Sequence, residues 1–394
     1  MQETQGSQVT EGETMRYGFT TGSCAAAASK AAAYMLLTGK LKTKITIETP
    51  KGVPYTAQLT DISRSEKEVS CAVEKDGGDD PDITTGALIY AKVSYGEPYR
   101  EKYGEGAGQT IEIDGGAGVG RVTKPGLDQP VGSAAINHVP REMIEEEVMQ
   151  VCQLADYKGS LRVEISVPDG EKLAQQTFNP RLGIVGGISI LGTSGIVEPM
   201  SNQAVLDTIR VELNQRRAQG FDYAAVSPGN DGLDFMKKTY GYDLDRSVKC
   251  SNFIGDTIDM AVELGFRKML LTGHIGKLIK VAGGIMNTHS KEADCRMELL
   301  AAFSVREGVE TAKIRQVLDC VTTEEAVFIL EDSGKLQAVM QTIVERICFY
   351  TEKRAKGKLQ MDCILYANEF GELAKSKGAV QWFTLLGQEQ VQQI

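Results

Sequence analysis

Five glycine-rich segments, four of which directly follow a short apolar run, constrain the fold of this 394-residue chain more than any other feature. Each segment also carries small hydroxyl or amide side chains. The segments span residues 18–24, 187–195, 227–231, 251–256 and 272–277. In a parallel α/β sheet, the residues just past the carboxyl ends of the strands line the ligand crevice. The pattern therefore predicts an enzyme with a small-molecule site.

Composition narrows the class of partner. The length fits two domains, and 42% apolar residues allow each a full core. A net charge of −10 argues against nucleic acid or an anionic membrane surface as a partner, because both need a basic face. The eight cysteines form no C-x-x-C pair, so we expect reduced thiols, no zinc cluster and a cytoplasmic protein. No apolar run approaches the ~18 residues that span a bilayer.

The first half of the chain reads as a sheet-rich α+β domain. We expect a flexible polar tail over residues 1–14 and the domain itself over 15–183. An Ala-rich helix is predicted at 23–37 and an amphipathic helix from Pro140. Strands are predicted at 45–48, 69–74, 87–94, 110–113, 119–123 and 161–167.

The second half, residues 184–394, reads as a doubly wound, Rossmann-like α/β domain with a helical C-terminal part. Short apolar strands alternate with helices there, which is typical of a parallel sheet. The predicted strands are 188–191, 223–226, 268–272 and a closing strand at 361–366. Helices are predicted from Ser201, at 254–264, 292–304 and 312–318, and from Leu336.

Several side chains near the loops have both a chemical and a structural interpretation. Lys277 and Lys280 lie at the start of a predicted helix, where a cation is unfavourable unless an anion binds there too, although solvation would also explain them. His274 and His289 are candidates for a base or a carboxylate contact, with a hydrogen-bonding scaffold as the commoner alternative. Cys24 at a helix N-terminus is a possible nucleophile, but its alanine neighbours favour a packing role.

The glycines at 115–120 come near a dinucleotide-binding fingerprint, but no predicted helix follows them. We interpret them as a bend or hairpin.

Four longer motifs carry a family resemblance. They are YGFTTGSCAA at 17–26, GVGRVTKPGL at 118–127, FNPRLGIVGG at 178–187 and GHIGKLIK at 273–280. In these motifs and their order the chain resembles the cobalt-precorrin-5B C1-methyltransferase (CbiD) family over residues 15–390. Ser23 and Ser194 stand where the family usually has Thr, and His138 stands where Pro is usual.

The resemblance implies transfer of a methyl group from S-adenosylmethionine to C1 of cobalt-precorrin-5B, giving cobalt-precorrin-6A in anaerobic cobalamin biosynthesis. The partner is then a tetrapyrrole, and cobalt arrives with it, so no protein-bound metal is expected. Such a transfer needs alignment in a dry pocket, not a catalytic triad. A homo-oligomer is compatible with this interpretation.

Residue roles follow from the same resemblance as hypotheses. An acidic side chain, Asp231 or Asp256, would bind the ribose hydroxyls, and His274 and His289 are the catalytic candidates. The cofactor candidates are Gly192, Thr193, Ser194, Gly195, Ser227, Gly229, Asn230, Asp231, Ser251, Asn252, Asp256, Thr272 and Gly273. The substrate candidates are Thr20, Thr21, Ser23, Arg121, Lys124, Arg141, Arg181, Lys277, Lys280 and Lys291, most of them cations suited to acetate and propionate arms.

Two other classes remain open. A non-catalytic carrier of corrinoid intermediates would need no second ligand site, so the extra glycine loops count against it. A nucleotide-dependent kinase or oxidoreductase would use residues 115–120 for phosphate.

Overall fold

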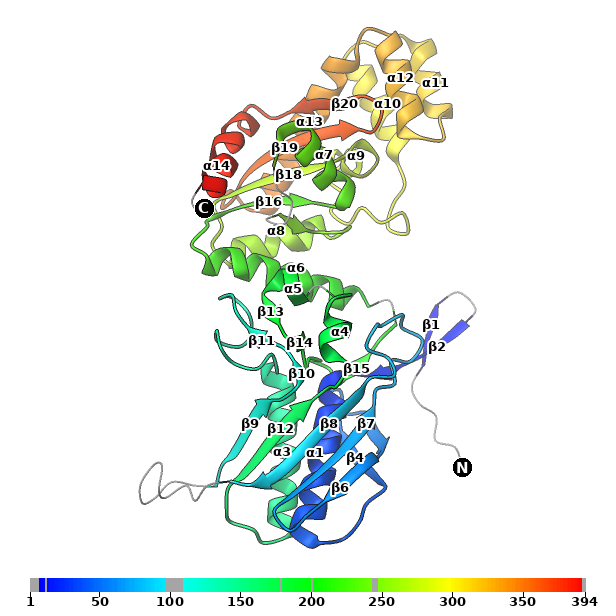
Figure 1. Ribbon diagram of the computed structural model, residues 1–394. Coiled ribbons are helices and arrows are strands. Elements are labelled where there is room, and N and C mark those ends of the chain that lie inside the picture. Colours follow the sequence, from blue (N-terminus) through cyan, green and yellow to red (C-terminus); the bar gives the residue numbers. More distant parts are fainter. Residues whose placement is uncertain are drawn as a thin grey trace. The chain divides into compact units, whose positions relative to one another are not determined.

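The computed structural model describes residues 7–10, 13–96, 109–177, 179–199, 201–242 and 247–391. The chain forms two compact units, Met1–Ser201 and Asn202–Ile394 (Figure 1). None of the helices in the described ranges is both long and apolar enough to cross a membrane.

The first unit combines one five-stranded sheet, several short strand pairs and two long helices. Its elements are β1 Ser7–Thr10, β2 Glu13–Arg16, β3 Gly18–Phe19, α1 Thr21–Thr38, β4 Lys44–Glu48, β5 Pro54–Gln58, β6 Thr60–Arg64, β7 Glu68–Glu74, β8 Leu88–Tyr95, β9 Ile111–Gly115, β10 Gly118–Val119, β11 Arg121–Val122, α3 His138–Leu154, β12 Leu161–Ser166, α4 Gly170–Ala174, α5 Asn179–Leu182, β13 Ile184–Val185, β14 Gly187–Ile188 and β15 Ile196–Val197.

The main sheet of this unit has the order β6-β7-β8-β12-β9, with only β12 and β9 parallel. Helix α1 packs against α3, β7 and β8. Seven alanines of α1 are fully buried, and their small side chains allow this close packing. Thr20 caps the start of α1, and Gly39 ends it at φ 70°, so the predicted helix is confirmed.

The short strands correct the predicted domain boundary. β14 pairs with β10, β13 with β11 and β15 with β3, so residues 184–197 belong to the first unit. The predicted strand 188–191 is therefore not part of the second sheet, and the units divide after Ser201 instead of after residue 183. Apolar runs this short do not reveal their pairing partner. The expected tail also differs, because β1 pairs with β2; residues 1–6 and 11–12 lie outside the described residues.

The second unit contains a five-stranded sheet and most of the helices. Its elements are α6 Asn202–Ala218, β16 Tyr223–Ser227, α7 Asn230–Tyr240, β17 Val248–Lys249, α8 Ile254–Glu263, β18 Lys268–His274, α9 Ile275–Ala282, α10 Arg296–Arg306, α11 Thr311–Asp319, α12 Thr323–Asp332, α13 Leu336–Arg354, β19 Gln360–Ala367, β20 Gly371–Lys375 and α14 Ala379–Val391.

The sheet of the second unit has the order β17-β16-β18-β19-β20. The first four strands are parallel and β20 is antiparallel, so the strand predicted to close the sheet is followed by one more. Met269 and Leu271 of β18 pack in a core shared with α8, α9 and α13, whereas Leu270 packs with α7 and α14. Helices therefore cover both faces of this sheet (Figure 1).

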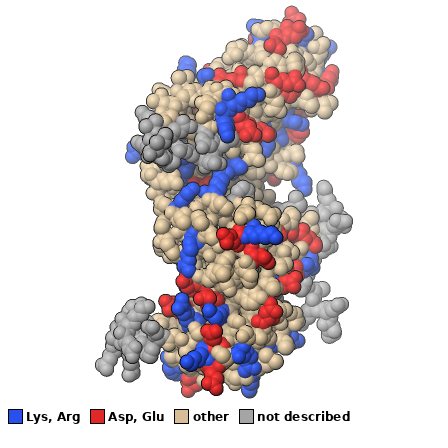
Figure 2. Space-filling view, in the orientation of Figure 1, with Lys and Arg blue, Asp and Glu red and all other residues tan. Residues whose placement is uncertain are grey.

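The helical part of this unit differs in detail from the prediction. α10 begins at Arg296, four residues later than expected, because Asn287 and His289 use their side chains to accept backbone N–H groups of the preceding turns. α12 was not predicted, although Thr322 and Glu325 form a capping box at its start. Figure 2 shows basic and acidic side chains interspersed on the visible face of the molecule.

Candidate functional site

The carboxyl ends of the parallel strands in the second unit form the candidate site. β16 ends at Ser227, β17 at Lys249 and β18 at His274, and α7, α8 and α9 follow them. The chain passes from β16 outward to β17 and then returns to β18 on the other side, so the strand order reverses between β16 and β18. Ligands bind at such a reversal in open α/β sheets. We call these strand ends and helix starts the carboxyl edge.

The start of α7 presents free backbone donors at the carboxyl edge. Gly229 precedes α7 in extended conformation, and no side chain caps the helix. Ser227 is buried and donates its hydroxyl to the Gly229 carbonyl, 3.0 Å away. Uncapped N–H groups at a helix start favour an anion or a polar ligand atom. Asp231 and Asn230, in the first turn, are exposed.

The turn after β17 is also unusual. Ser251 has φ 50°, a left-handed conformation that is uncommon for a residue other than glycine. α8 begins after Phe253 without a side-chain cap, and Asp256 lies in its first turn. The Asn252 carbonyl accepts the backbone N–H of Thr288, and its amide oxygen accepts the Thr288 hydroxyl at 3.2 Å. Asn252 therefore holds the 287–289 loop beside the turn.

His274 connects the carboxyl edge to α12. Its Nδ1 accepts the Gly276 N–H at 3.1 Å and so caps α9. The ring proton is therefore on Nε2, which donates to Glu324 Oε1 at 2.9 Å. The same carboxylate oxygen accepts the Asn368 N–H at 2.9 Å. Because both ring nitrogens are engaged, this arrangement gives His274 a positioning role and leaves no free nitrogen for a base.

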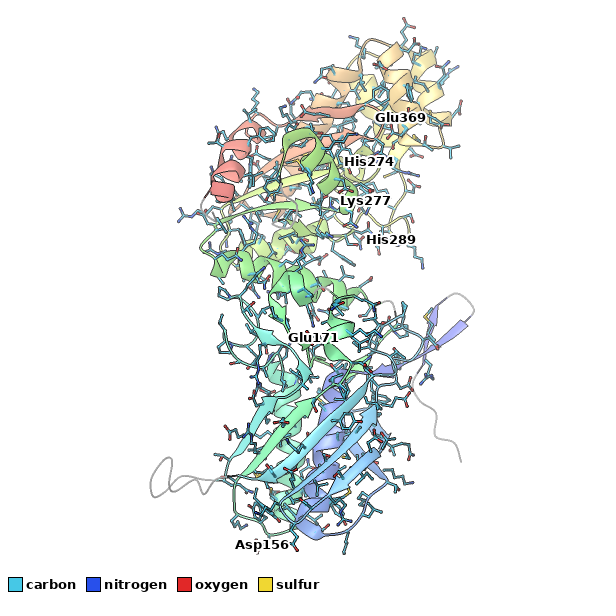
Figure 3. All side chains as sticks on the ribbon, viewed as in Figure 1. Asp156, Glu171, His274, Lys277, His289 and Glu369 are labelled. Atoms are coloured by element: carbon cyan, nitrogen blue, oxygen red, sulfur yellow. The ribbon has the colours of Figure 1, made fainter. Side chains whose placement is uncertain are left out.

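The two lysines of α9 differ in their burial and in their hydrogen bonds. Lys277 is half-buried, and among the described residues its Nζ makes only a long 3.5 Å bond to the Pro228 carbonyl at the end of β16. Burial raises the pKa of the Cys250 thiol to about 12, and the charge of Lys277 opposes that rise. Lys280 is buried and donates to the Thr288 carbonyl at 3.1 Å. Lys277, labelled in Figure 3, is thus the less buried cation of this pair.

The loop after α9 carries the other two predicted side chains. His289 and Lys291 are exposed, and His289 Nδ1 accepts the backbone N–H of Lys291. Thr272 and Gly273 are buried in β18.

The predicted cofactor residues of the 192–195 turn lie in the first unit, where they contact the start of α1. Ser23 is fully buried and donates to the Gly195 carbonyl at 2.6 Å. The Thr21 hydroxyl accepts the Leu191 N–H at 3.0 Å, and Thr20 caps α1. These hydroxyls, predicted to bind substrate, therefore hold this turn in place. The structure does not bring the 192–195 turn into one unit with residues 227–231 and 251–256.

Most of the predicted cations of the first unit already have partners. Arg121 forms a bidentate ion pair with Asp114, at 2.7 and 3.1 Å. Arg141 donates to the carbonyls of Ile136 and Ile113. Lys124 is exposed and donates to the carbonyl of Arg181. A substrate carboxylate would have to displace these interactions.

Two further motifs of the first unit are structural. The glycines at 115–120 run through β9 and β10 into β11, and the next helix is α3, so the predicted bend is confirmed. Burial raises the pKa of the Cys24 thiol to about 11, and its Sγ lies 3.6 Å from Tyr55 Oη. Both observations support packing as the role of Cys24.

A hollow of ≈ 340 Å³ beside α3 is lined by Met149 and by Glu142, Glu145 and Glu146. The three carboxylates would repel an anionic ligand.

Sequence reasoning missed three side chains at the carboxyl edge. Glu324 arrives from α12, Phe235 from α7, and Tyr366 from the end of β19. Tyr366 lies beside His274 in the strand register, with ring centroids 5.5 Å apart. The capping box at 322–325 could have revealed the start of α12, but no local pattern links Glu324 to a histidine 50 positions earlier.

Comparisons with known proteins show the family of this chain. The CbiD profile matches residues 8–199, and the CbiD C-terminal domain profile matches residues 287–377. A cobalt-precorrin-5B C(1)-methyltransferase of Ruminiclostridium cellulolyticum is 47% identical over 93% of this chain and 92% of its own. One from Thermoanaerobacter sp. is 46% identical over 95% and 99%. The 1.9 Å crystal structure of a cobalamin biosynthesis protein (cbiD) from Archaeoglobus fulgidus has 27% identity and a TM-score of 0.38, covering 73% of this chain and 86% of that one. By its identity to the first two relatives over nearly its whole length, this chain belongs to the CbiD family.

Proposed function

We propose that this protein is a cobalt-precorrin-5B C1-methyltransferase, which uses S-adenosylmethionine to methylate C1 of the cobalt tetrapyrrole and forms cobalt-precorrin-6A. The names of the curated relatives support the reaction, since proteins 46% and 47% identical over more than nine-tenths of this chain carry that activity in their names. The observation that carries the site is the carboxyl edge, where the strand order reverses and α7 and α8 begin without side-chain caps.

We place the methyl donor at the carboxyl edge, with the second unit acting as a Rossmann-like domain. S-adenosylmethionine supplies an electrophilic methyl group when bound. The uncapped N–H groups at the start of α7 suit its carboxylate, and the exposed carboxylate of Asp231 suits its ribose hydroxyls. Asp256, in the first turn of α8, is the alternative ribose contact. The turn at 192–195 is engaged with α1 in the first unit, so we leave it out of this proposal.

Lys277 is our candidate for a carboxylate arm of the tetrapyrrole. It lies in the first turn of α9, where a cation is disfavoured by the helix dipole, and its contact to Pro228 is long. An anionic ligand group would relieve that conflict. Lys280, by contrast, is buried against the 287–289 loop and would act by holding it.

The reaction requires the protein to orient the methyl donor and the tetrapyrrole and to exclude water, because a sulfonium methyl needs no covalent enzyme intermediate. His274 fits an orienting role. It fixes the start of α9, and with it Lys277, through bonds to Gly276 and Glu324.

The deciding experiment incubates the protein with isotopically labelled S-adenosylmethionine and cobalt-precorrin-5B and measures the product by mass spectrometry. We expect one labelled methyl group in the product. An unchanged tetrapyrrole mass would remove the methyltransferase proposal and favour a corrinoid carrier. Calorimetry with S-adenosylhomocysteine, ATP and NADP tests the remaining class, because tight ATP or NADP binding without S-adenosylhomocysteine binding would favour a kinase or oxidoreductase.

Lys277→Met tests the substrate contact. We expect its KM for the tetrapyrrole to rise about tenfold, as for loss of one charged hydrogen bond, with kcat little changed. Lys268→Met is the matched control, because Lys268 lies at the opposite end of the strand that precedes α9. An equal rise in KM for both variants would contradict the contact.

A further inference from the structure

Tyr366 is a buried tyrosine at the carboxyl edge whose ring is held on two sides. Only 3% of the residue is exposed. Its ring stacks on Phe235 of α7, with centroids 4.5 Å apart and planes 6° apart. The His274 ring meets it edge-on, with ring centroids 5.5 Å apart and planes 75° apart. The side chain is therefore fixed in orientation by its neighbours.

The hydroxyl of this fixed ring has no hydrogen-bond partner among the residues that the structure describes. A phenol both donates and accepts, and the oxygen of Tyr366 is not among the fully buried unpartnered polar atoms of the described residues, so it keeps contact with solvent. The hydroxyl is therefore unpaired within the described residues and available to a ligand at the carboxyl edge.

Two carboxylates set the charge around this hydroxyl. Asp231 lies four residues before Phe235 in α7 and so on the same face of the helix, one turn closer to its start. Burial first, and then the charges of Asp231 and Asp234, raise the pKa of Tyr366. Neither carboxylate forms an ion pair within the described part of the chain. An anionic ligand group would be repelled beside the Tyr366 hydroxyl, whereas a cationic or hydroxyl-bearing group would be favoured there.

The charge of the carboxyl edge therefore differs between its two sides. Lys277 supplies a positive charge beside the ends of β16 and β17, and Asp231 and Asp234 supply negative charge beside the end of β19. A polyanionic tetrapyrrole suits the first side. The methyl donor, whose sulfonium is positive, suits the second.

We propose that Tyr366 forms a hydrogen bond to the methyl donor and that Asp231 and Asp234 favour its sulfonium form over the uncharged thioether product. This inference rests on the proposed methyltransferase function and adds a contact residue and a basis for releasing S-adenosylhomocysteine. Loss of charge at sulfur on methyl transfer removes the attraction to the two carboxylates, so the product binds less tightly than the donor at this side.

Calorimetry of the purified full chain with S-adenosylmethionine and with S-adenosylhomocysteine tests the inference. Tyr366→Phe keeps the stacked ring and removes only the hydroxyl, and we expect it to weaken binding of both ligands by about 2- to 10-fold, as for one hydrogen bond. Asp234→Asn should weaken S-adenosylmethionine by about 2-fold or more and leave S-adenosylhomocysteine nearly unchanged, because only the donor carries the sulfonium charge.

Tyr240→Phe is the matched control. Tyr240 belongs to the same group of aromatic rings, since it meets Phe235 edge-on and stacks on Phe383, and its buried hydroxyl has no hydrogen-bond partner among the described residues. It lies at the far end of α7, so we expect unchanged binding. Equal binding by Tyr366→Phe and the unaltered protein would overturn the inference while leaving the proposed function intact. If the unaltered protein binds neither ligand, the proposed function and the inference both fail.

Discussion

The replacement His274→Ala tests the central contact of the carboxyl edge. It removes the acceptor that caps α9, a loss of about 1 kcal/mol, and the hydrogen bond to the Glu324 carboxylate, worth about 1.5–3 kcal/mol. Both side chains are about one-quarter exposed, so water replaces part of what is lost. We therefore expect the second unit to lose about 2–3 kcal/mol of unfolding free energy.

The chain offers a local reporter for this measurement. Trp382 is the only tryptophan in the sequence, lies buried in α14, and donates Nε1–H to Asp362 at 2.9 Å. Urea unfolding followed by its fluorescence reports the second unit, which matters because a two-unit protein has no single unfolding free energy. With a slope of about 2 kcal/mol per molar urea, the midpoint should fall by about 1–1.5 M.

Three comparisons separate the two parts of the effect. His274→Asn keeps a capping oxygen but does not reach Glu324, so it should recover about 1 kcal/mol. A double-mutant cycle with Glu324→Ala should give a coupling energy of about 1 kcal/mol or more. His289→Ala, an exposed histidine in a loop, should change stability by less than about 0.5 kcal/mol. A His274→Ala midpoint no lower than that of His289→Ala would refute the reasoning.

The first unit gives two further predictions. Lys75 is 2% exposed and pairs with Asp82 at 2.6 Å, so Asp82→Asn should destabilise this unit by about 3 kcal/mol, measured by urea unfolding followed by circular dichroism. Burial raises the pKa of Asp82, but the charge and hydrogen bonds of Lys75 and Thr84 outweigh it and lower the pKa below 3.8. This contribution should therefore be complete above about pH 4 and lost as the pH falls further; equal acid sensitivity of Asp82→Asn and the unaltered protein would contradict it. Because the pKa of the Cys24 thiol is about 11, iodoacetamide at pH 8 should leave it unmodified in the native protein, and Cys24→Ala should keep full methyltransferase activity; rapid alkylation detected by peptide mass spectrometry would reverse that conclusion.

The elements with long, regular patterns could be predicted from the sequence. The alanines at 25–28 give the chain from Thr21 to Thr38 its helix, and the apolar stripe after Leu336 gives α13. β16, β18 and β19 are also where the apolar runs place them. Short strands were less predictable, because two apolar residues such as those of β13 carry no periodicity and take their place from the strand they meet.

The candidate site was predictable in part. The carboxyl-edge loops at 227–231, 251–256 and 272–277 do follow parallel strands of one sheet, as the glycine pattern indicates. The 192–195 turn has the same composition, but its bonds to Thr21 and Ser23 place it against α1. Composition alone does not distinguish a loop that is open to a ligand from one whose polar groups are satisfied by the chain itself.

By itself, the sequence determined local conformation and family, because helix propensity, apolar periodicity and long motifs act over neighbouring residues. Only the tertiary structure decided which polar groups remain free. His274 is occupied by Gly276 and Glu324, whereas Lys277 and the hydroxyl of Tyr366 are left available at the carboxyl edge. Those outcomes depend on contacts between residues tens of positions apart, which form only when the sheet and its helices pack.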